Sequence, residues 1–482
     1  MTIGSAINNA LSGLNAYSRS ASVIASNTAN AMTEGYTKRR VELTPTQLGN
    51  HGAGVQVVDT TRQTNLQATT LRRASGGENE ASQYEADKLA TLADIFGDPG
   101  TSDGIVGALT TFGLAIASAE ADPSSTVRLK QLQTASQDVV DQIQSAARTI
   151  QDLRTSADHD IGKAVSTSNT LIERIEKLNG DITSAHQRGL DALSLEDERQ
   201  GHLDELGKLM EINVVRRDQD SVAIFTPGGA MLLDGKARKL NFTPTAVVTQ
   251  EKTISGGQLS DVSVDGQPTA LSSAELFTGG KIEAMLKIRD MRAVSVANNL
   301  DDLAADLATR FQADVADPTL GAADPALFTD NGLKFDSAHQ PGIAARLTLN
   351  ANVAPASGDI YKLRDGLGAT AYGPAADATL LGAMSSAFSA VKVHAGATGQ
   401  ALSAVGFGEF LAAAAKQDQH ISESNAAFSS VKFDRLREEE LGLTAVNTDE
   451  ETQKILEIEN AYLANTKVFS IADEMLKNLL QI

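Results

Sequence analysis

The sequence contains no cysteine and no tryptophan, and aromatic residues make up only 4% of its 482 positions. Without cysteine there can be no disulfide, no thiolate nucleophile and no cysteine-ligated metal. With so few aromatic rings, the hydrophobic cores must be built from Leu, Ile, Val and Ala. Such cores suit long, closely packed helices better than a deep aromatic-lined ligand pocket. The length predicts more than one folding unit.

Positive charge is also scarce, since 41 Lys and Arg stand against 61 Asp and Glu, a net charge of −20. Phosphate backbones repel so acidic a chain, and no basic patch interrupts it. The first twenty residues have no basic start, no continuous apolar centre and no cleavage site, which argues against a secretory signal peptide. The longest uncharged apolar run, residues 104–119, is too short for a membrane span, and we expect a buried helix there. We therefore expect neither nucleic-acid binding nor membrane insertion.

The N-terminal segment carries a heptad seam that continues for about four heptads. Its positions are Ile3, Ile7, Ala10, Leu14, Tyr17, Ala21, Ile24, Thr28 and Ala31. Up to Met32 the only charge is Arg19, and the remaining surface is largely Ser, Asn and Ala. Because Ser and Asn are poor helix formers, we expect this segment to fray when alone in water. The uncharged outer face indicates close packing on every side, as in a multi-subunit assembly; an ordinary bundle helix is the alternative.

The C-terminal segment follows the same alternation at Ile455, Ile458, Tyr462, Asn465, Phe469, Ala472, Leu476 and Leu479. A second apolar row flanks it, formed by Ala461, Ala464, Val468, Ile471, Met475 and Ile482. The spacing of Thr448 and Glu451 predicts a capping box and a helix start near Asp449. We predict that the two terminal segments pair as a parallel or antiparallel coiled coil. The residues expected to carry assembly are Ile3, Ile7, Leu14, Tyr17, Ile24, Ile458, Tyr462, Phe469, Leu476 and Leu479.

The middle of the chain is predicted to be helical with two strand-rich stretches. Long helices are expected over residues 127–186, with a stutter or small break near Ala157, and over 281–314 and 408–440. Ser194 and Asp197 have capping-box spacing before an acidic helix. Residues 212–271 carry short apolar strands between turn signals, which predicts a small antiparallel β unit.

The predicted fold class is mainly α: a long-helix bundle with paired N- and C-terminal coiled-coil helices and a small inserted antiparallel β unit. The expected domains are discontinuous. Residues 1–45 and 445–482 form the terminal coiled coil, 46–211 and 281–444 the helical bundle, and 212–280 the β unit. A short irregular or β stretch is expected near residues 320–387.

No pattern in the sequence predicts an active site, a cofactor or a metal. The seven histidines lack metal-ligand spacing. Gly52-Ala53-Gly54 lacks the third glycine of a phosphate-binding loop and is better interpreted as a turn into a hairpin. The acidic clusters 196–198 and 438–440 are interleaved with basic residues, which predicts solvated helix faces. We therefore expect a protein that is not an enzyme; an enzyme would need a convergent polar pocket.

A short motif closes the N-terminal helix. Asn27 and Asn30 are followed by Gly35 and Tyr36 in the pattern N-x-x-N…G-Y. This motif resembles the N-terminal signature of bacterial flagellar axial proteins, the family of rod, hook and hook-associated proteins. The physical chemistry fits, because Gly35 permits a sharp chain reversal and Tyr36 can anchor it against the helix.

Further segments, in the same order as in the family, resemble hook-associated protein 1 more than rod or hook subunits. They lie at residues 52–72, 121–128, 195–214 and 279–290. The C-terminal segment is similar to the family's V-N-x-D-E-E…Y-x-A-N signature at Asn447, Asp449, Glu450 and Asn465. One departure is that family members often carry an additional β-domain, for which residues 320–387 are too few.

The resemblance implies a structural protein of the hook–filament junction, outside the cell, exported through the flagellar type III apparatus without a cleaved signal peptide. It implies contacts with hook protein and hook-associated protein 3, self-association in the axial assembly, and a cytoplasmic export chaperone on the C-terminal helix. A rod or hook subunit of the same family and a non-flagellar helical adhesin are the alternatives.

Overall fold

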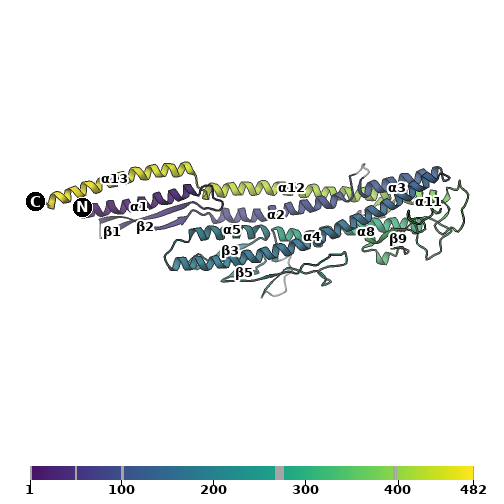
Figure 1. Ribbon diagram of the computed structural model, residues 1–482, viewed down its shortest axis with the longest axis horizontal. Helices are drawn as coiled ribbons and strands as arrows, with labels where there is room; N and C mark the ends of the chain where they lie inside the picture. Colours follow the sequence, from purple (N-terminus) through teal and green to yellow (C-terminus); the bar gives the residue numbers. More distant parts are fainter. Residues whose placement is uncertain are drawn as a thin grey trace. The chain divides into compact units, whose positions relative to one another are not determined.

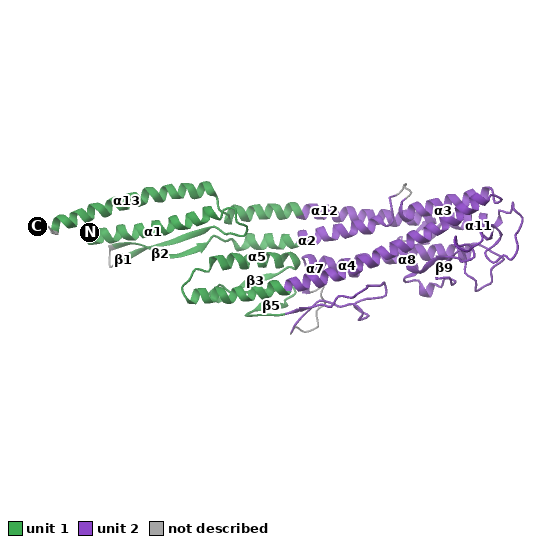
Figure 2. Ribbon diagram, viewed as in Figure 1, with its two compact units in different colours: residues 1–77, 169–238, 430–482 green, residues 78–168, 239–429 purple. Residues whose placement is uncertain are grey.

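The computed structural model describes residues 3–48, 51–98, 103–265, 276–394, 397 and 399–480. The chain is mainly α-helical with short antiparallel strands, which confirms the predicted fold class. It divides into two compact units built from separate stretches of sequence (Figure 2). Unit 1 comprises residues 1–77, 169–238 and 430–482, and unit 2 comprises residues 78–168 and 239–429. The domain boundaries expected from the sequence remain predictions.

Unit 1 contains both ends of the chain (Figure 1). Its helices and strands are α1 (Ile3–Ala29), β1 (Arg39–Leu48), β2 (His51–Arg62), α5 (Leu193–Leu209), β3 (Asn213–Arg216), β4 (Val222–Phe225), β5 (Met231–Asp234), β6 (Lys236–Ala237) and α13 (Thr448–Leu480), with the 3₁₀ turn η1 (Asp218–Asp220). Parts of α2 (Leu66–Asp94), α4 (Thr126–Gln187) and α12 (Ala404–Thr444) also belong to it.

Two antiparallel sheets lie in unit 1. Strands β1 and β2 form the expected hairpin, with an irregularity between Glu42 and Leu43. The expected turn at Gly52-Ala53-Gly54 is wrong, because these residues lie within β2 and Gly52 pairs with Gln47 of β1. Strands β3 to β6 form a four-stranded sheet in sequential order, and β4 is its buried centre. The tight turn from β5 to β6 uses Gly235 at φ 73°, a left-handed conformation that glycine adopts without strain. The short antiparallel strands predicted for residues 212–271 are therefore present, although residues 266–271 lie outside the described residues.

Unit 2 holds the remaining elements. These are α3 (Gly104–Ala121), β7 (Leu240–Asn241), β8 (Ser263–Val264), α7 (Lys281–Lys287), α8 (Ala293–Thr309), β9 (Phe328–Asp330), η4 (Ser337–His339), α9 (Ile343–Arg346), β10 (Leu347–Leu349), α10 (Lys362–Asp365), α11 (Thr379–Ser389), β11 (Lys392–His394) and β12 (Gln400–Leu402), together with parts of α2, α4 and α12. Two π-helical turns, η2 (Ile288–Arg292) and η3 (Arg310–Asp314), extend α8 at its two ends.

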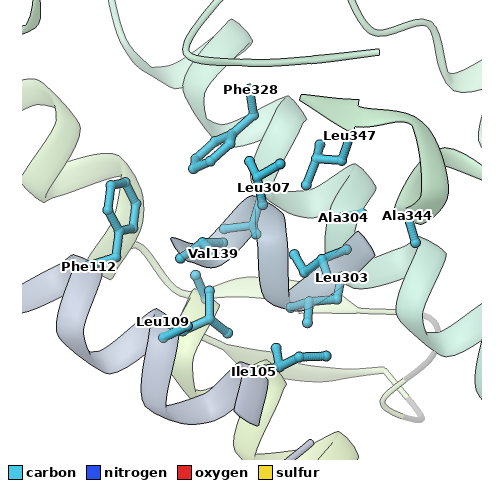
Figure 3. Packing of buried hydrophobic residues seen from close by; sticks show 14 of the residues in the cluster. Ile105, Leu109, Phe112, Val139, Leu303, Ala304, Leu307, Phe328, Ala344 and Leu347 are labelled. Atoms are coloured by element: carbon cyan, nitrogen blue, oxygen red, sulfur yellow. The ribbon is translucent and has the colours of Figure 1, made fainter. Parts of the chain in front are cut away.

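The buried hydrophobic residues of unit 2 include one large continuous cluster. Ile105, Leu109 and Phe112 of α3 are fully buried in it (Figure 3). The Phe112 ring lies 5.6 Å from the Phe328 ring and 5.1 Å from the Phe388 ring, both edge-to-face. The expectation of a buried helix at residues 104–119 is confirmed. Within the described residues, α3 is also the one helix long and apolar enough to cross a membrane.

Arg154, Arg289 and Arg310 are fully buried in unit 2, and their guanidinium groups bind partners within the chain. Arg289 forms an ion pair of 2.6 Å with Asp158, and both side chains are fully buried. Arg310 forms an ion pair of 2.6 Å with Asp306. The Arg154 guanidinium donates to three backbone carbonyls. Since an unpaired buried charge is costly, these contacts hold α4 to η2 and to the loop at Thr249 and Lys252.

Some local predictions need correction. Helix α4 runs unbroken from Thr126 to Gln187, so the shift near Ala157 is a stutter and the alternative of a break is wrong. Helix α5 begins at Leu193, before the expected capping box. The Asp191 carboxylate accepts the Leu193 N–H at 2.8 Å, and Ser194 accepts a hydrogen bond from Arg39 instead of capping the helix.

Helix α13 also begins one residue earlier than expected. The Asn447 side-chain oxygen accepts the N–H groups of Asp449 and Glu450, at 3.0 and 3.2 Å. Asn447 is therefore the N-cap, and Thr448 is the first helical residue. The capping-box interpretation of Thr448 and Glu451 is wrong because Glu451 points into a buried polar cluster described below.

Candidate assembly site at the terminal helices

Helices α1 and α13 lie side by side and antiparallel in unit 1 (Figure 1). Two contacts fix their register. Asn27 donates to the Glu451 carboxylate at 2.8 Å, and a Cβ on Gly13 would lie 3.0 Å from Asn465 Nδ2. Gly13 precedes Asn27 in α1 by the same number of residues by which Asn465 follows Glu451 in α13. The two helices therefore run in opposite directions with a constant register. The pairing predicted from the two heptad seams is therefore present, and its direction is antiparallel.

The predicted seam residues differ widely in burial. Ile24 is buried, at 9% exposure. The half-buried ones are Ile3, Ile7, Leu14, Tyr17, Ile458 and Phe469. The exposed ones are Tyr462, Leu476 and Leu479. The seam is thus only partly covered within one chain, and the assembly role of these residues remains a prediction.

A second apolar row runs along the C-terminal half of α13. We name Val468, Ile471, Met475 and Leu479 the outer row; their exposed fractions lie between 48% and 59%. They stand at spacings of three and four residues, so they share one side of the helix. The face that includes Asn465 and the buried Ala472 is turned toward α1. The outer row therefore leaves a continuous apolar strip uncovered on a single chain.

The hairpin β1–β2 covers another side of α1. Ser12 accepts the Val55 N–H at 3.2 Å, and Gly54 lies so close that an added Cβ would be 2.0 Å from Ser12 Oγ. Gly54 also has φ 102°, so a side chain at this position would be strained as well as crowded. The polar uncharged surface of α1, which suggested packing against other subunits, is thus partly covered by the chain's own hairpin.

The N-terminal signature motif forms a turn that is hydrogen-bonded to the buried Asn27 side chain. The Asn27 side-chain oxygen accepts from the Tyr36 hydroxyl at 2.9 Å and from the Arg39 N–H at 3.0 Å. Its amide group donates to the Arg39 carbonyl and to Glu451. Gly35 adopts φ 80°, which reverses the chain as predicted. Tyr36 therefore anchors the turn to α1 through Asn27.

Charged groups complete this cluster. Lys38 Nζ lies 2.7 Å from Glu450 and 3.4 Å from Glu451, and Lys454 lies 2.7 Å from Glu450. The side chains of Lys38 and Glu451 are 7% and 1% exposed. Hydrogen bonds from Lys38 and Lys454 lower the pKa of Glu450 to about 2. We name Asn27, Tyr36, Lys38, Glu450 and Glu451 the signature cluster. It joins the end of α1 and the following turn to the start of α13.

The other predicted signature residues have local roles. Asn30 donates to the Ser26 carbonyl at 2.9 Å, at the end of α1. Asn447 caps α13 by accepting from Asp449, and Asn465 is the residue that meets Gly13. Sequence reasoning missed Lys38 and Glu451 as cluster members. The signal for Glu451 was present, because it stands on the same heptad phase as Asn465.

The acidic clusters were only partly interpreted correctly. Glu196 and Asp197 form ion pairs with Arg62 at 3.2 and 2.8 Å, and Asp197 lies 3.6 Å from Arg39. These carboxylates are only 15% and 12% exposed. The expectation of solvated acidic faces is therefore wrong for them, because the basic residues of the β1–β2 hairpin pack against α5.

In the second acidic cluster, residues 438–440, one carboxylate is also poorly exposed and paired with an arginine. Glu440, which is 13% exposed, lies 2.5 Å from Arg72. Arg72 also reaches Asp204 at 2.6 Å, and Arg73 reaches Asp204 at 3.0 Å. This network joins α2, α5 and α12 within unit 1. The exposed Glu438 and Glu439 fit the original interpretation.

Among the described residues one group could hold a metal by geometry: His186, Glu196 and Asp220, whose ligand atoms lie within 4.8 Å of one another. Residues of three different elements meet there, so no sequence spacing could have revealed the group. Glu196 already pairs with Arg62, and His186 and Asp220 are exposed. These residues do not make a built metal site.

Comparison with known proteins gives matches at both the middle and the end of the chain. Residues 89–316 match the family described as flagellar hook-associated protein FlgK helical domain. Residues 443–482 match the family described as flagellar basal body rod FlgEFG protein C-terminal.

Curated relatives include the flagellar hook-associated protein 1 of Salmonella typhimurium, 22% identical over 320 residues, and that of Escherichia coli, 22% identical over 318 residues. Each match covers 64% of this chain and 56% of the relative, so the chain spans just over half the length of the relatives it matches. A solved structure, the flagellar hook junction protein FlgK from Burkholderia pseudomallei, is 19% identical with a TM-score of 0.45; the match covers 55% of this chain and 47% of that one.

Proposed function

Because the chain belongs to the family of flagellar hook-associated proteins, we propose that it is a structural subunit of the junction between the flagellar hook and the filament, required for filament assembly. The observation that carries the proposal is the antiparallel pair of α1 and α13, which leaves the outer row exposed. We assign the chain no enzymatic activity, since its relatives are flagellar structural proteins.

The outer row supplies a physical reason for self-association. Each of its four side chains is about half exposed, and covering the remainder would contribute about 1 kcal/mol per residue. Such a gain is small for one contact but is repeated at every neighbour of a closed or helical assembly. The neighbour proposed for this strip is therefore another axial subunit.

The proposed partners follow from the position at the junction. Hook protein lies on one side and hook-associated protein 3 on the other, and copies of this chain contact one another in the axial assembly. We further propose export through the flagellar type III apparatus without a cleaved signal peptide, and a cytoplasmic chaperone that covers the apolar rows of α13 before assembly. A covering partner would prevent the exposed strip from causing premature association.

The test is electron microscopy of cells that lack this gene, together with an assay for flagellin in the medium. Finished hooks without filaments, with flagellin shed into the medium, are the expected result. Restoration of filaments by the intact chain is the control. Normal flagella in the deletion strain would contradict the proposal.

A second candidate, a rod or hook subunit, is favoured by one observation only, the match of residues 443–482 to the C-terminal region of rod proteins. That function predicts missing hooks in the same deletion strain. The match of residues 89–316 to the hook-associated helical domain favours the junction.

A further inference from the structure

Helix α13 presents more apolar surface than α1 can cover. One row, with Ile458, Phe469 and Ala472, lies on the side turned toward α1, and the outer row lies next to it. Hydrophobic burial is non-directional, so it would accept either row against α1 after a modest rotation of α13. Something other than apolar area must therefore select the orientation that the structure shows.

Polar contacts of the required kind occur at two points. Asn27 donates to Glu451 at 2.8 Å, and the polar side chain of the half-buried Asn465 packs against Gly13, where an added Cβ would lie 3.0 Å from its Nδ2. The two points are about two heptads apart on both helices, so they share one heptad phase. Buried polar residues on a heptad seam are the best-attested means of fixing register in coiled helices.

The charges around Glu451 make the wrong orientation costly. Lys38 and Glu451 are nearly fully buried, and Lys38 is held between Glu450 and Glu451. Rotating α13 until the outer row faces α1 would carry Glu451 away from Asn27 and Lys38. Asn27 would then lose one of the two acceptors of its amide group, and the buried Lys38 ammonium group would lose one of its two carboxylates.

We infer that Asn27, Lys38 and Glu451, together with the Gly13–Asn465 contact, determine the rotation and register of α13 on α1, so that the outer row stays exposed for another copy of this chain. The inference rests on the proposed function in naming the use of the outer row. The positioning role itself concerns a single chain. Asn27 and Glu451 are thus positioning residues for assembly.

The experiment uses disulfide trapping, because the chain has no cysteine and introduced pairs are its only thiols. Ser20 lies midway between Gly13 and Asn27, and Ile458 lies midway between Glu451 and Asn465. The double variant Ser20→Cys with Ile458→Cys therefore reports the observed register. The matched pair, Ser20→Cys with Glu457→Cys, reports rotation, because adjacent helical residues point about 100° apart. Both pairs are made in the full-length chain and oxidised under identical conditions.

In the parent chain we expect the Ser20–Ile458 pair to form about tenfold more disulfide than the Ser20–Glu457 pair. The same pairs are then placed in a chain with Asn27→Leu, Lys38→Met and Glu451→Leu, which makes the cluster apolar without leaving an unpaired charge. The preference should fall below about twofold there. A chain with Glu459→Leu, an exposed position on α13, should keep the preference.

Equal oxidation of the two pairs in the parent chain, or an undiminished preference in the apolar variant, would overturn the inference. Circular dichroism checks that each variant keeps its helical content. Complementation of the deletion strain by the cysteine-free chain tests the junction function separately. If complementation fails while the disulfide preference is observed, the function is wrong and the positioning role stands.

Discussion

The long helices α1 and α3 carry one charge each, and their surroundings differ. Helix α3 in unit 2 has Glu120 as its only charge, and its Ile105, Leu109 and Phe112 are fully buried. Helix α1 in unit 1 has Arg19 as its only charge, yet most of its seam is half-buried. In both helices the scarcity of charged residues goes with a surface that packs against other side chains. For α3 the packing partner is the chain's own core, and for α1 it is only partly within the chain.

The same contrast applies to the polar contacts of the two units. In unit 2 the buried Arg289 and Asp158 pair next to Ile288 and Ala157, which belong to a core buried within the chain itself. In unit 1 the buried Lys38 and Glu451 hold two helices in an orientation that leaves apolar surface outside. Buried charges thus lie within the core in unit 2. In unit 1 they orient a helix whose outer apolar row stays exposed.

The largest expected effect lies in the unit 2 core. Replacing Phe112 with Ala removes a ring that contacts other phenylalanine rings and should lower the free energy of unfolding by about 3–5 kcal/mol. Chemical denaturation followed by circular dichroism measures the change. Leu114→Ala on the same helix, where the side chain is 69% exposed, should change stability by no more than about 0.5 kcal/mol. Equal effects of the two changes would mean that α3 is not the core helix described.

A smaller effect is expected at the signature cluster. Asn27→Ala leaves the Tyr36 hydroxyl, the Arg39 N–H and Glu451 without their shared partner, and should cost about 2–3 kcal/mol. Hydrogen exchange should show faster exchange in α1 and α13 and unchanged protection in α3. Asn15→Ala, at an exposed position of α1, serves as the control. Loss of protection throughout unit 2 would contradict the idea that the cluster acts locally.

The smallest effect is a pH dependence from Glu450. Its pKa is lowered from 4.5 to about 2 by hydrogen bonds from Lys38 and Lys454, so its stabilising contribution is complete above pH 4.5 and is lost as the pH falls toward 2. The contribution should stay below about 1 kcal/mol, because the Glu450 side chain is 47% exposed. Urea unfolding of the parent chain and of Glu450→Gln should differ more near pH 5 than near pH 2. A difference that grows on acidification would have the wrong sign.

The sequence predicted α3, α4, α12, the β unit and the pairing of the termini because each depends on local periodicity, but it did not predict the 29-residue helix α2. The heptad phases of Ile24 and Phe469 and the turn at Gly35 are visible in neighbouring residues. The partners of Lys38, Arg72 and Glu440 were not predictable, because ion pairs join residues whose separation in sequence carries no pattern. The same holds for the direction of the terminal pair, which apolar seams alone leave open.

The central claim is that the outer row of α13 packs against a neighbouring subunit in the assembly. The variant Ile471→Asp tests this claim most directly. Ile471 is 50% exposed, so the change should alter the stability of the isolated chain by no more than about 0.5 kcal/mol. In the deletion strain, the Ile471→Asp chain should fail to restore filaments, whereas Glu459→Gln at another exposed position of α13 should restore them. Normal filaments with Ile471→Asp would contradict the account.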